Sequence, residues 1–115
     1  KSLGQKKYYS CCKYSDFMIG NSSSGLLEMP SFKKGTIDIG DRQRGRLKAK
    51  SIISVKLSRK EIIKGINLLY SNKFQKKIKS TKNPYGEGGA SKKIIKILMK
   101  TKLENILKKK FYSLR

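Results

Sequence analysis

The sequence of 115 residues contains no histidine, and this absence limits the chemistry that the chain can perform. Histidine is the commonest general acid or base in enzymes, so any catalysis would rest on carboxylates, arginines, lysines, tyrosines or cysteines. A structural zinc site needs about four cysteine or histidine ligands. The chain has two cysteines, Cys11 and Cys12, which are adjacent. The sequence therefore excludes a structural zinc site, and we expect no metal and no other cofactor.

Long apolar runs are absent too. No run approaches the roughly 18 residues of a membrane-spanning helix, and no signal peptide is visible in the printed sequence. Neighbouring cysteines on a helix point about 100° apart and do not easily form a disulfide. We therefore expect Cys11 and Cys12 to be reduced, half-buried packing residues of a cytoplasmic protein that does not bind a membrane.

Acidic residues are scarce. The chain has 7 aspartates and glutamates against 29 lysines and arginines, which gives a formal net charge of +22. Such a balance invites a nucleic-acid interpretation. The excess comes mainly from lysine, scattered over many segments, whereas arginine is the residue of shaped phosphate recognition. We therefore attribute the excess positive charge to drift in amino-acid composition, and keep nucleic-acid binding as the less favoured alternative.

The apolar pattern predicts three short strands separated by helices. Short apolar runs without alternation are typical of parallel strands that are covered on both faces. We expect strands over 16–20, 36–40 and 51–55. The predicted fold class is α/β with a small parallel sheet. Three strands are few for a doubly wound sheet, so we expect the chain to be the end of a larger protein.

Helical spacing and capping signals place the other elements. A first helix is expected over 3–14. A short one starts near Ser23 or Ser24 and stops before Pro30, because the residue before a proline disfavours helix. Residues 32–35 are expected to form a loop, and residues 41–50 a polar loop or short helix. Ser58 and Glu61 form a capping box for a helix that runs through residue 70.

The C-terminal part is expected to begin with a short helix around 74–78, followed by a glycine-rich turn over 83–89. That turn could line a ligand, although a hinge or a loop that starts the next helix would explain it equally well. Ser91 is expected to cap a last helix. Its apolar side is expected to consist of Ile94, Ile95, Leu98, Met99, Leu103, Ile106 and Leu107.

The most informative segment is the serine loop, residues 20–25, which joins the first strand to the short helix. Ser22, Ser23 and Ser24 offer hydroxyl and backbone N–H donors between Gly20 and Gly25. A helix dipole would add about half a positive charge there, so a diphosphate could bind. The alternative is an ordinary helix cap, for which one serine suffices. The segment is not a P-loop, since GxxxxGK[ST] is missing.

Two further features flank this loop in the sequence. Glu28 could accept hydrogen bonds from the two hydroxyls of a ribose, although a surface glutamate near a helix start is the commoner case. The arginine loop, residues 40–46, carries Arg42, Arg44 and Arg46 just after the second strand. Guanidinium groups fork onto phosphate oxygens, and Asp41 could orient one of them. A solvated basic loop is the alternative.

Together these segments closely resemble the C-terminal part of the hydrolysing UDP-N-acetylglucosamine 2-epimerases. The resemblance runs from Leu3 to Leu98, and the order and spacing of the pieces make it specific. The segments that carry it are IGNSSSG (19–25), EMPSF (28–32), IGDRQRGR (39–46) and NPYG (83–86).

The resemblance implies a glycosyltransferase-B-like fold, in which two Rossmann-like domains hold the nucleotide between them. It also implies conversion of UDP-N-acetylglucosamine and water to N-acetylmannosamine and UDP, by elimination of UDP and then hydration. Close relatives use a diacetylated bacillosamine nucleotide. By position, Ser22 and Ser23 match the serines that contact the diphosphate, Glu28 the glutamate that holds the ribose, and Arg42 an arginine of the pocket.

Departures from the family also matter. The family usually has proline where Gly35 stands, and we expect the glycine to loosen a loop here. Asparagine is common in the family where Gly89 stands. The family's acid and base residues lie mainly in regions that this chain does not hold, so we expect no catalytic residue in it.

The resulting prediction is a partial Rossmann-like domain. Residues 1–107 would be the C-terminal nucleotide-binding segment of an epimerase and residues 108–115 a basic tail. The expected partners are a UDP-sugar, the N-terminal half of the epimerase in the same or a separate chain, and a second copy of the protein. A non-catalytic UDP-binding remnant or subunit is the alternative. The predicted UDP-binding residues are Ser22, Ser23, Ser24, Gly25, Glu28 and Arg42.

Overall fold

The fold is built on a three-stranded parallel sheet. The structure is a computed structural model that describes residues 2–102 and 104. Its strands are β1 (Phe17–Gly20), β2 (Gly35–Ile39) and β3 (Ile52–Val55), in the order β1-β2-β3 with β2 in the centre. The register aligns Ile19 of β1, Ile37 of β2 and Ile53 of β3. This arrangement confirms the predicted α/β class and the parallel sheet, and is consistent with a partial Rossmann-like domain.

The two connections between the strands differ. Helix α2 (Ser24–Leu27) and the 3₁₀ helix η1 (Met29–Phe32) join β1 to β2. The segment from β2 to β3 contains only turns and bends, so the option of a short helix over 41–50 is wrong. The expected loop over 32–35 is also wrong at its ends, because η1 includes Phe32 and β2 begins at Gly35.

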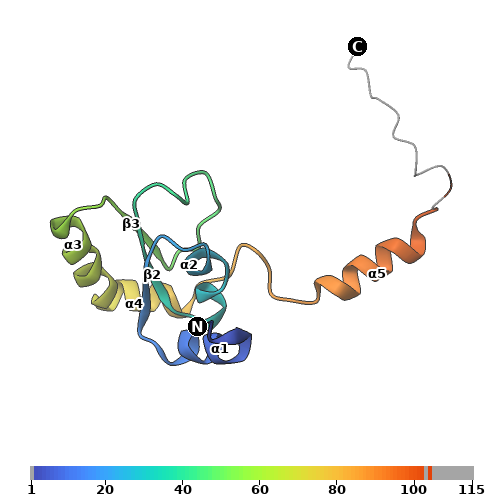
Figure 1. The fold of residues 1–115 in the computed structure, drawn as a ribbon, viewed down its shortest axis with the longest axis horizontal. Helices are drawn as coiled ribbons and strands as arrows, with labels where there is room; N and C mark the ends of the chain where they lie inside the picture. Colours follow the sequence, from blue (N-terminus) through green and yellow to red (C-terminus); the bar gives the residue numbers. More distant parts are fainter. Residues whose placement is uncertain (1, 103, 105–115) are drawn as a thin grey trace, which may run out of the picture.

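One face of the sheet carries the main hydrophobic core. Helices α3 (Arg59–Tyr70) and α4 (Asn72–Lys79) cover this face (Figure 1). Side chains alternate along a strand, so Ile37 and Ile53 point to the same face. The buried core cluster consists of Ile37, Ile53, Val55, Leu69, Phe74 and Ile78.

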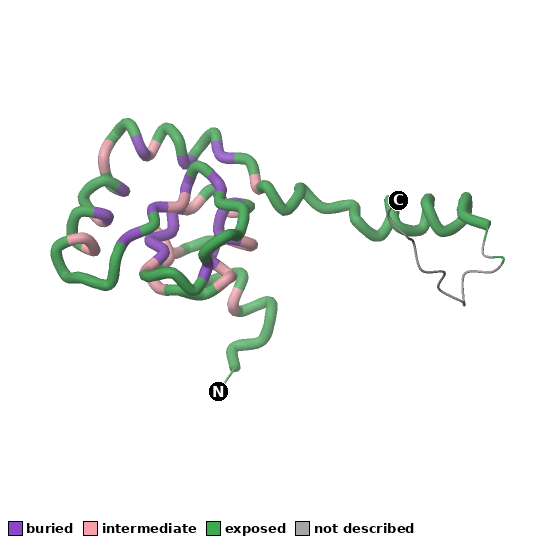
Figure 2. The backbone as a smooth tube through the Cα atoms, turned by 90° about the horizontal axis from the view of Figure 1, so that it is seen from above, coloured by how far each residue is buried: buried purple, intermediate pink, exposed green. Residues whose placement is uncertain are grey.

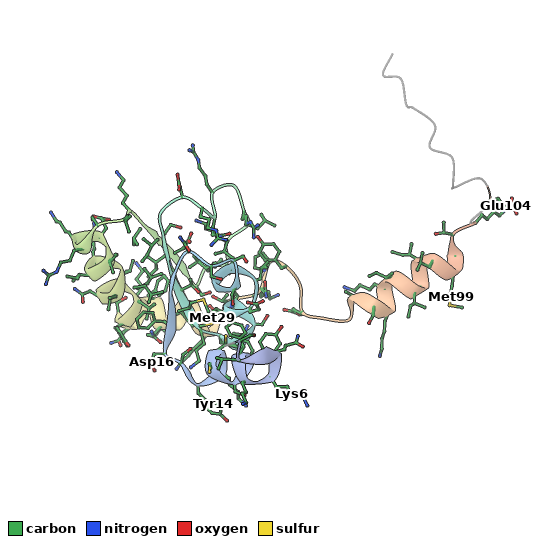
Figure 3. The ribbon with its side chains drawn as sticks, in the orientation of Figure 1. Lys6, Tyr14, Asp16, Met29, Met99 and Glu104 are labelled. Carbon is green, nitrogen blue, oxygen red and sulfur yellow. The ribbon has the colours of Figure 1, made fainter. Side chains whose placement is uncertain are left out.

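The other face of the sheet packs against α2 and η1, and α1 (Gly4–Tyr14) contacts η1. Leu26 and Met29 are fully buried there, and Figure 3 shows Met29 among the packed side chains beside the sheet. Cys12 is buried and Cys11 is exposed, and both thiols are free. The expected packing role therefore holds for Cys12. It does not hold for Cys11, because adjacent side chains on a helix point about 100° apart, so Cys11 faces solvent while Cys12 faces the core.

Capping agrees with the sequence at some helices and not at others. Ser58 Oγ accepts a hydrogen bond from the backbone N–H of Glu61 at 3.2 Å, as the capping box predicts. Helix α5 (Ala90–Lys100) instead begins after Gly89, whose φ of 73° is left-handed, and no side chain caps it. The predicted cap at Ser91 is therefore wrong, because Ser91 already lies inside the helix.

Helix α5 lies apart from the sheet (Figure 1), and every residue of it is exposed (Figure 2). Its predicted apolar positions Ile94, Ile95, Leu98 and Met99 all face solvent. The remaining positions predicted for that side, and the boundary expected at residue 107, lie outside the described residues. In the described ranges, no helix has the length and apolar character needed to cross a bilayer.

Gly35 has a packing role. An added Cβ would lie 2.8 Å from Leu69 Cδ1 and 3.1 Å from Ile78 Cδ1, so a larger residue would press on the core. The family's usual proline is therefore replaced by glycine at the buried start of β2. The expectation that this departure loosens a loop is wrong, because Gly35 lies in the strand.

A buried ion pair connects the central strand to the segment that follows it. Asp38 of β2 is 1% exposed, and Lys48 Nζ donates to its Oδ2 at 2.8 Å. The same Nζ donates to Ser54 Oγ of β3 at 2.7 Å. Lys48 therefore ties the β2–β3 segment across two neighbouring strands.

We predict that Lys48→Met lowers the free energy of unfolding by about 2–3 kcal/mol, because it leaves the buried Asp38 carboxylate without its cation. Urea denaturation measures the change. Asp38→Asn in the same background should recover part of the loss, since it removes the uncompensated charge. Lys56→Met, on an exposed lysine, is the control. Equal stability of Lys48→Met and the wild type would contradict this role for the ion pair.

Candidate functional site

The carboxyl ends of all three strands lie at one edge of the sheet, because the strands are parallel. The serine loop follows β1 at this edge, and the arginine loop follows β2, the neighbouring strand. Ligands of open α/β sheets bind at this edge. The topology therefore brings together the two loops that the sequence singled out.

Asn21 joins the two loops directly. Gln43 Nε2 donates to the backbone carbonyl of Asn21 at 2.7 Å, and Arg42 Nη1 reaches Asn21 Oδ1 at 3.5 Å. Gln43 is 2% exposed although it stands between two exposed arginines. Its buried amide fixes the arginine loop against the serine loop, and Arg42 contacts the side chain of Asn21, the residue before Ser22.

The serine loop is organised differently from a simple cap. Ser23 precedes α2 but makes no side-chain capping bond, and Ser22 Oγ accepts instead from the backbone N–H of Ser24 at 3.3 Å. In the described part of the chain, the backbone N–H groups of Ser22 and Ser23 have no hydrogen-bond partner. These two N–H groups and the hydroxyl of Ser23 are thus available to an anion.

The predicted contribution of a helix dipole needs correction. Helix α2 has 4 residues, which is about one turn. A macrodipole grows from many aligned peptide units, so α2 supplies little of the expected partial charge. Attraction for a phosphate at this edge must come from individual N–H donors and from arginine.

Ser24 faces away from the other serines and toward α1. Its Oγ is hydrogen-bonded to the hydroxyl of Tyr8. Burial raises the pKa of the Tyr8 hydroxyl above its ordinary value, and the neighbouring Cys12 side chain adds to the effect. Tyr8 therefore stays protonated at neutral pH and keeps this contact. The structure gives Ser24 a role in joining α1 to the serine loop.

Gly25 lies where α2 approaches the central strand most closely. Thr36 Oγ1 of β2 donates to the carbonyl of Gly25 at 2.9 Å. A Cβ on Gly25 would lie 2.5 Å from Thr36 Cγ2, which no ordinary contact allows. Glycine at this position therefore sets the distance between α2 and β2, and thus the place of the serine loop.

Glu28 stands at the C-terminal end of α2 and is half-buried. No donor among the described residues reaches its buried Oε2. Buried polar atoms in proteins almost always have a hydrogen-bond partner. An acceptor of this kind suits a ligand that brings hydroxyl donors, as the two hydroxyls of a ribose do.

The arginine loop does not have the internal ion pair that Asp41 could have supplied. Within residues 2–102 and 104, the structure has one ion pair, between Lys48 and Asp38. Arg42, Arg44 and Arg46 are all exposed. The backbone of the loop is therefore held by its own turns and by Gln43, and the three guanidinium groups remain accessible.

A shallow hollow of about 380 Å³ lies at the ends of β2 and β3. Asp41 and Ser54 are part of its lining, but none of the predicted UDP-binding residues is. Among the described residues, no three histidine, cysteine, aspartate or glutamate side chains gather as a metal site.

Sequence reasoning missed Asn21 and Gln43. Nothing in the local pattern distinguishes a glutamine between arginines from any other loop residue. The only signal for these two residues was that both loops follow neighbouring strands of the sheet, so some residues of the two loops must be in contact.

We predict that Gly25→Ala lowers the free energy of unfolding by about 1–3 kcal/mol, because the new methyl group overlaps Thr36 Cγ2. Thermal denaturation measures the loss. Adding Thr36→Ser removes Cγ2 and keeps the hydroxyl, so the double variant should be more stable than Gly25→Ala alone. If Thr36→Ser does not rescue Gly25→Ala, the close contact is not the cause.

Comparison with known proteins gives a consistent result. The family model described as UDP-N-acetylglucosamine 2-epimerase matches residues 1–99. The chain is 41% identical over 116 residues to polysialic acid biosynthesis protein P7 of Escherichia coli. It is 43% identical over 114 residues to the GDP/UDP-N,N'-diacetylbacillosamine 2-epimerase (hydrolyzing) of Campylobacter jejuni.

Each of these alignments covers 98% of this chain and 29% of the relative. A UDP-N,N'-diacetylbacillosamine 2-epimerase (hydrolyzing) of Legionella pneumophila is 33% identical over 98 residues, which cover 85% of this chain and 25% of that protein. The chain thus spans less than a third of the length of these relatives. On the family match and these identities, the chain belongs to the UDP-N-acetylglucosamine 2-epimerase family.

Proposed function

We propose that this chain forms the nucleotide-binding wall of a hydrolysing UDP-sugar 2-epimerase. The observation that carries the proposal is the contact of the serine and arginine loops through Asn21 at the carboxyl edge of the sheet. This contact joins the loop that carries the free N–H groups of Ser22 and Ser23 to the loop that carries Arg42, and N–H donors together with a guanidinium group suit a diphosphate.

Each predicted residue has a role in this proposal. The N–H groups of Ser22 and Ser23 donate to the diphosphate, and Arg42 neutralises part of its charge. Glu28 accepts hydrogen bonds from the ribose hydroxyls through the oxygen that no protein donor reaches. Ser24 and Gly25 act through the backbone and the packing of α2.

The reaction itself needs groups outside this chain. In the parent enzyme, UDP-N-acetylglucosamine and water would give N-acetylmannosamine and UDP, and the matching reaction of a UDP-diacetylbacillosamine would follow the same course. The chain binds and orients the leaving UDP, whose departure its donors favour by stabilising the developing negative charge. The acid and base residues would come from the N-terminal half, in the same or a separate chain, in the cytoplasm.

We predict that UDP binds the chain saturably, and that Glu28→Ala and Arg42→Ala each weaken binding at least about tenfold, because each removes a charge-assisted contact. Isothermal titration calorimetry measures the dissociation constants. Lys73→Ala on α4 and Glu104→Ala are the controls for loss of one charge, since neither residue lies at the carboxyl edge.

Two outcomes of this titration would argue against the proposal. Absence of binding at millimolar UDP would identify the chain as a remnant without a nucleotide site. Binding of arbitrary DNA duplexes with an affinity that falls steeply with salt, and with no preference for UDP, would instead support the nucleic-acid alternative.

We also predict that the 115-residue chain alone does not turn over UDP-N-acetylglucosamine, because the facing half of the cleft is needed for proton transfer. Proton NMR of the reaction mixture follows N-acetylmannosamine directly. Steady release of this sugar by the purified chain would show that the acid and base residues lie in it.

A further inference from the structure

The segment Asn83-Pro84-Tyr85, which we call the strap, contacts both parts of the proposed nucleotide wall. The sequence alone predicted a turn that lines a ligand, acts as a hinge or starts the next helix. In the structure, its two polar side chains reach segments that lie 38 to 56 residues earlier in the chain. Contacts over such distances along the chain point to more than a local turn.

Asn83 holds the junction between α2 and η1, where Glu28 stands and which we call the Glu28 corner. Its side-chain Nδ2 donates to the backbone carbonyl of Leu27 at 2.7 Å and to Ser31 Oγ at 2.7 Å. Leu27 is the residue before Glu28, and Ser31 lies in η1 just after it. One amide group therefore bridges both sides of the Glu28 position.

Tyr85 holds the far end of the arginine loop. Its hydroxyl donates to the backbone carbonyl of Leu47 at 3.1 Å, one residue after Arg46. Leu47 is 65% exposed, so side-chain packing does little to hold the loop at this point. The Tyr85 hydroxyl supplies a fixed point instead.

The strap is internally stiff. Asn83 Oδ1 accepts from the backbone N–H of Tyr85 at 3.0 Å, and the N–H of Gly86 donates to the Asn83 carbonyl at 3.1 Å. The ring of Pro84 fixes its φ. The two anchoring side chains are thus fixed relative to each other, and the chain turns at Gly86, where φ is 113°.

We propose that the strap positions the Glu28 corner and the arginine loop relative to each other, and so sets the spacing between the ribose and diphosphate parts of the nucleotide wall. The inference rests on the proposed function. Neither Asn83 nor Tyr85 touches the nucleotide in this arrangement, so both are positioning residues. Asn83 serves the ribose side, and Tyr85 serves the diphosphate side.

The division of roles can be tested with two ligands, UDP and inorganic pyrophosphate, because pyrophosphate has no ribose. Tyr85→Phe removes one hydroxyl and should weaken both ligands about fivefold to tenfold. Asn83→Ser keeps a side-chain oxygen for the Tyr85 N–H but cannot span to Leu27. It should weaken UDP about tenfold and leave pyrophosphate within twofold.

Matched controls are Tyr70→Phe and Asn72→Ser, at exposed positions of α3 and α4, and all four variants are compared with the wild type by calorimetry and thermal denaturation. UDP affinities of Asn83→Ser and Tyr85→Phe equal to those of the wild type would overturn the inference while leaving the proposed function intact. Equal weakening of UDP and pyrophosphate by Asn83→Ser would also overturn it. A wild-type chain that binds no UDP would remove the proposed function and the strap's role together.

Discussion

The parallel pairing of β1 and β3 with the central β2 is the constraint on which the rest of this structure depends. It brings the ends of all three strands to one edge, so loops that are 20 residues apart become neighbours. The cost of such non-local pairing is the entropy of closing the connections. Burial of Ile37, Ile53 and Val55 against α3 and α4 opposes that cost.

Buried polar groups then determine how the loops sit on this edge. Gln43 holds the arginine loop to Asn21, and Lys48 holds its continuation to Asp38 and Ser54. These contacts are directional, whereas hydrophobic burial is not. They fix the position of the arginine loop without using the arginine side chains. The three guanidinium groups therefore remain exposed for a ligand.

Much of the fold could be predicted from local patterns. Three β-branched residues within 36–39 specify a strand, and the apolar spacing of Ile62, Ile66 and Leu69 specifies a helix. Ser58 marks the start of that helix, because its hydroxyl caps a backbone N–H. The membership in the epimerase family could also be recognised, because several short segments occur in a specific order.

Other features depend on contacts that no local pattern contains. Ser24 bonds to Tyr8 because α1 returns to the serine loop, and Gly35 leaves room for Leu69 on a helix far along the chain. The predicted cap at Ser91 was wrong because the left-handed Gly89, two residues earlier, occupies the N-cap position of α5. The assignment of Ser22, Ser23, Glu28 and Arg42 to UDP remains a prediction that rests on the resemblance and on their placement at the edge.

The glycines that follow the strap separate the edge of the sheet from the C-terminal helix α5. Gly86, Gly88 and Gly89 all have positive φ and lie in exposed backbone between the strap and α5. Insertions and deletions are tolerated best in such exposed connections. A change in the length of this connection would redirect α5 and leave every hydrogen bond around Asn21, Gln43 and Asn83 in place. The position of the C-terminal helix is therefore independent of the contacts that shape the edge of the sheet.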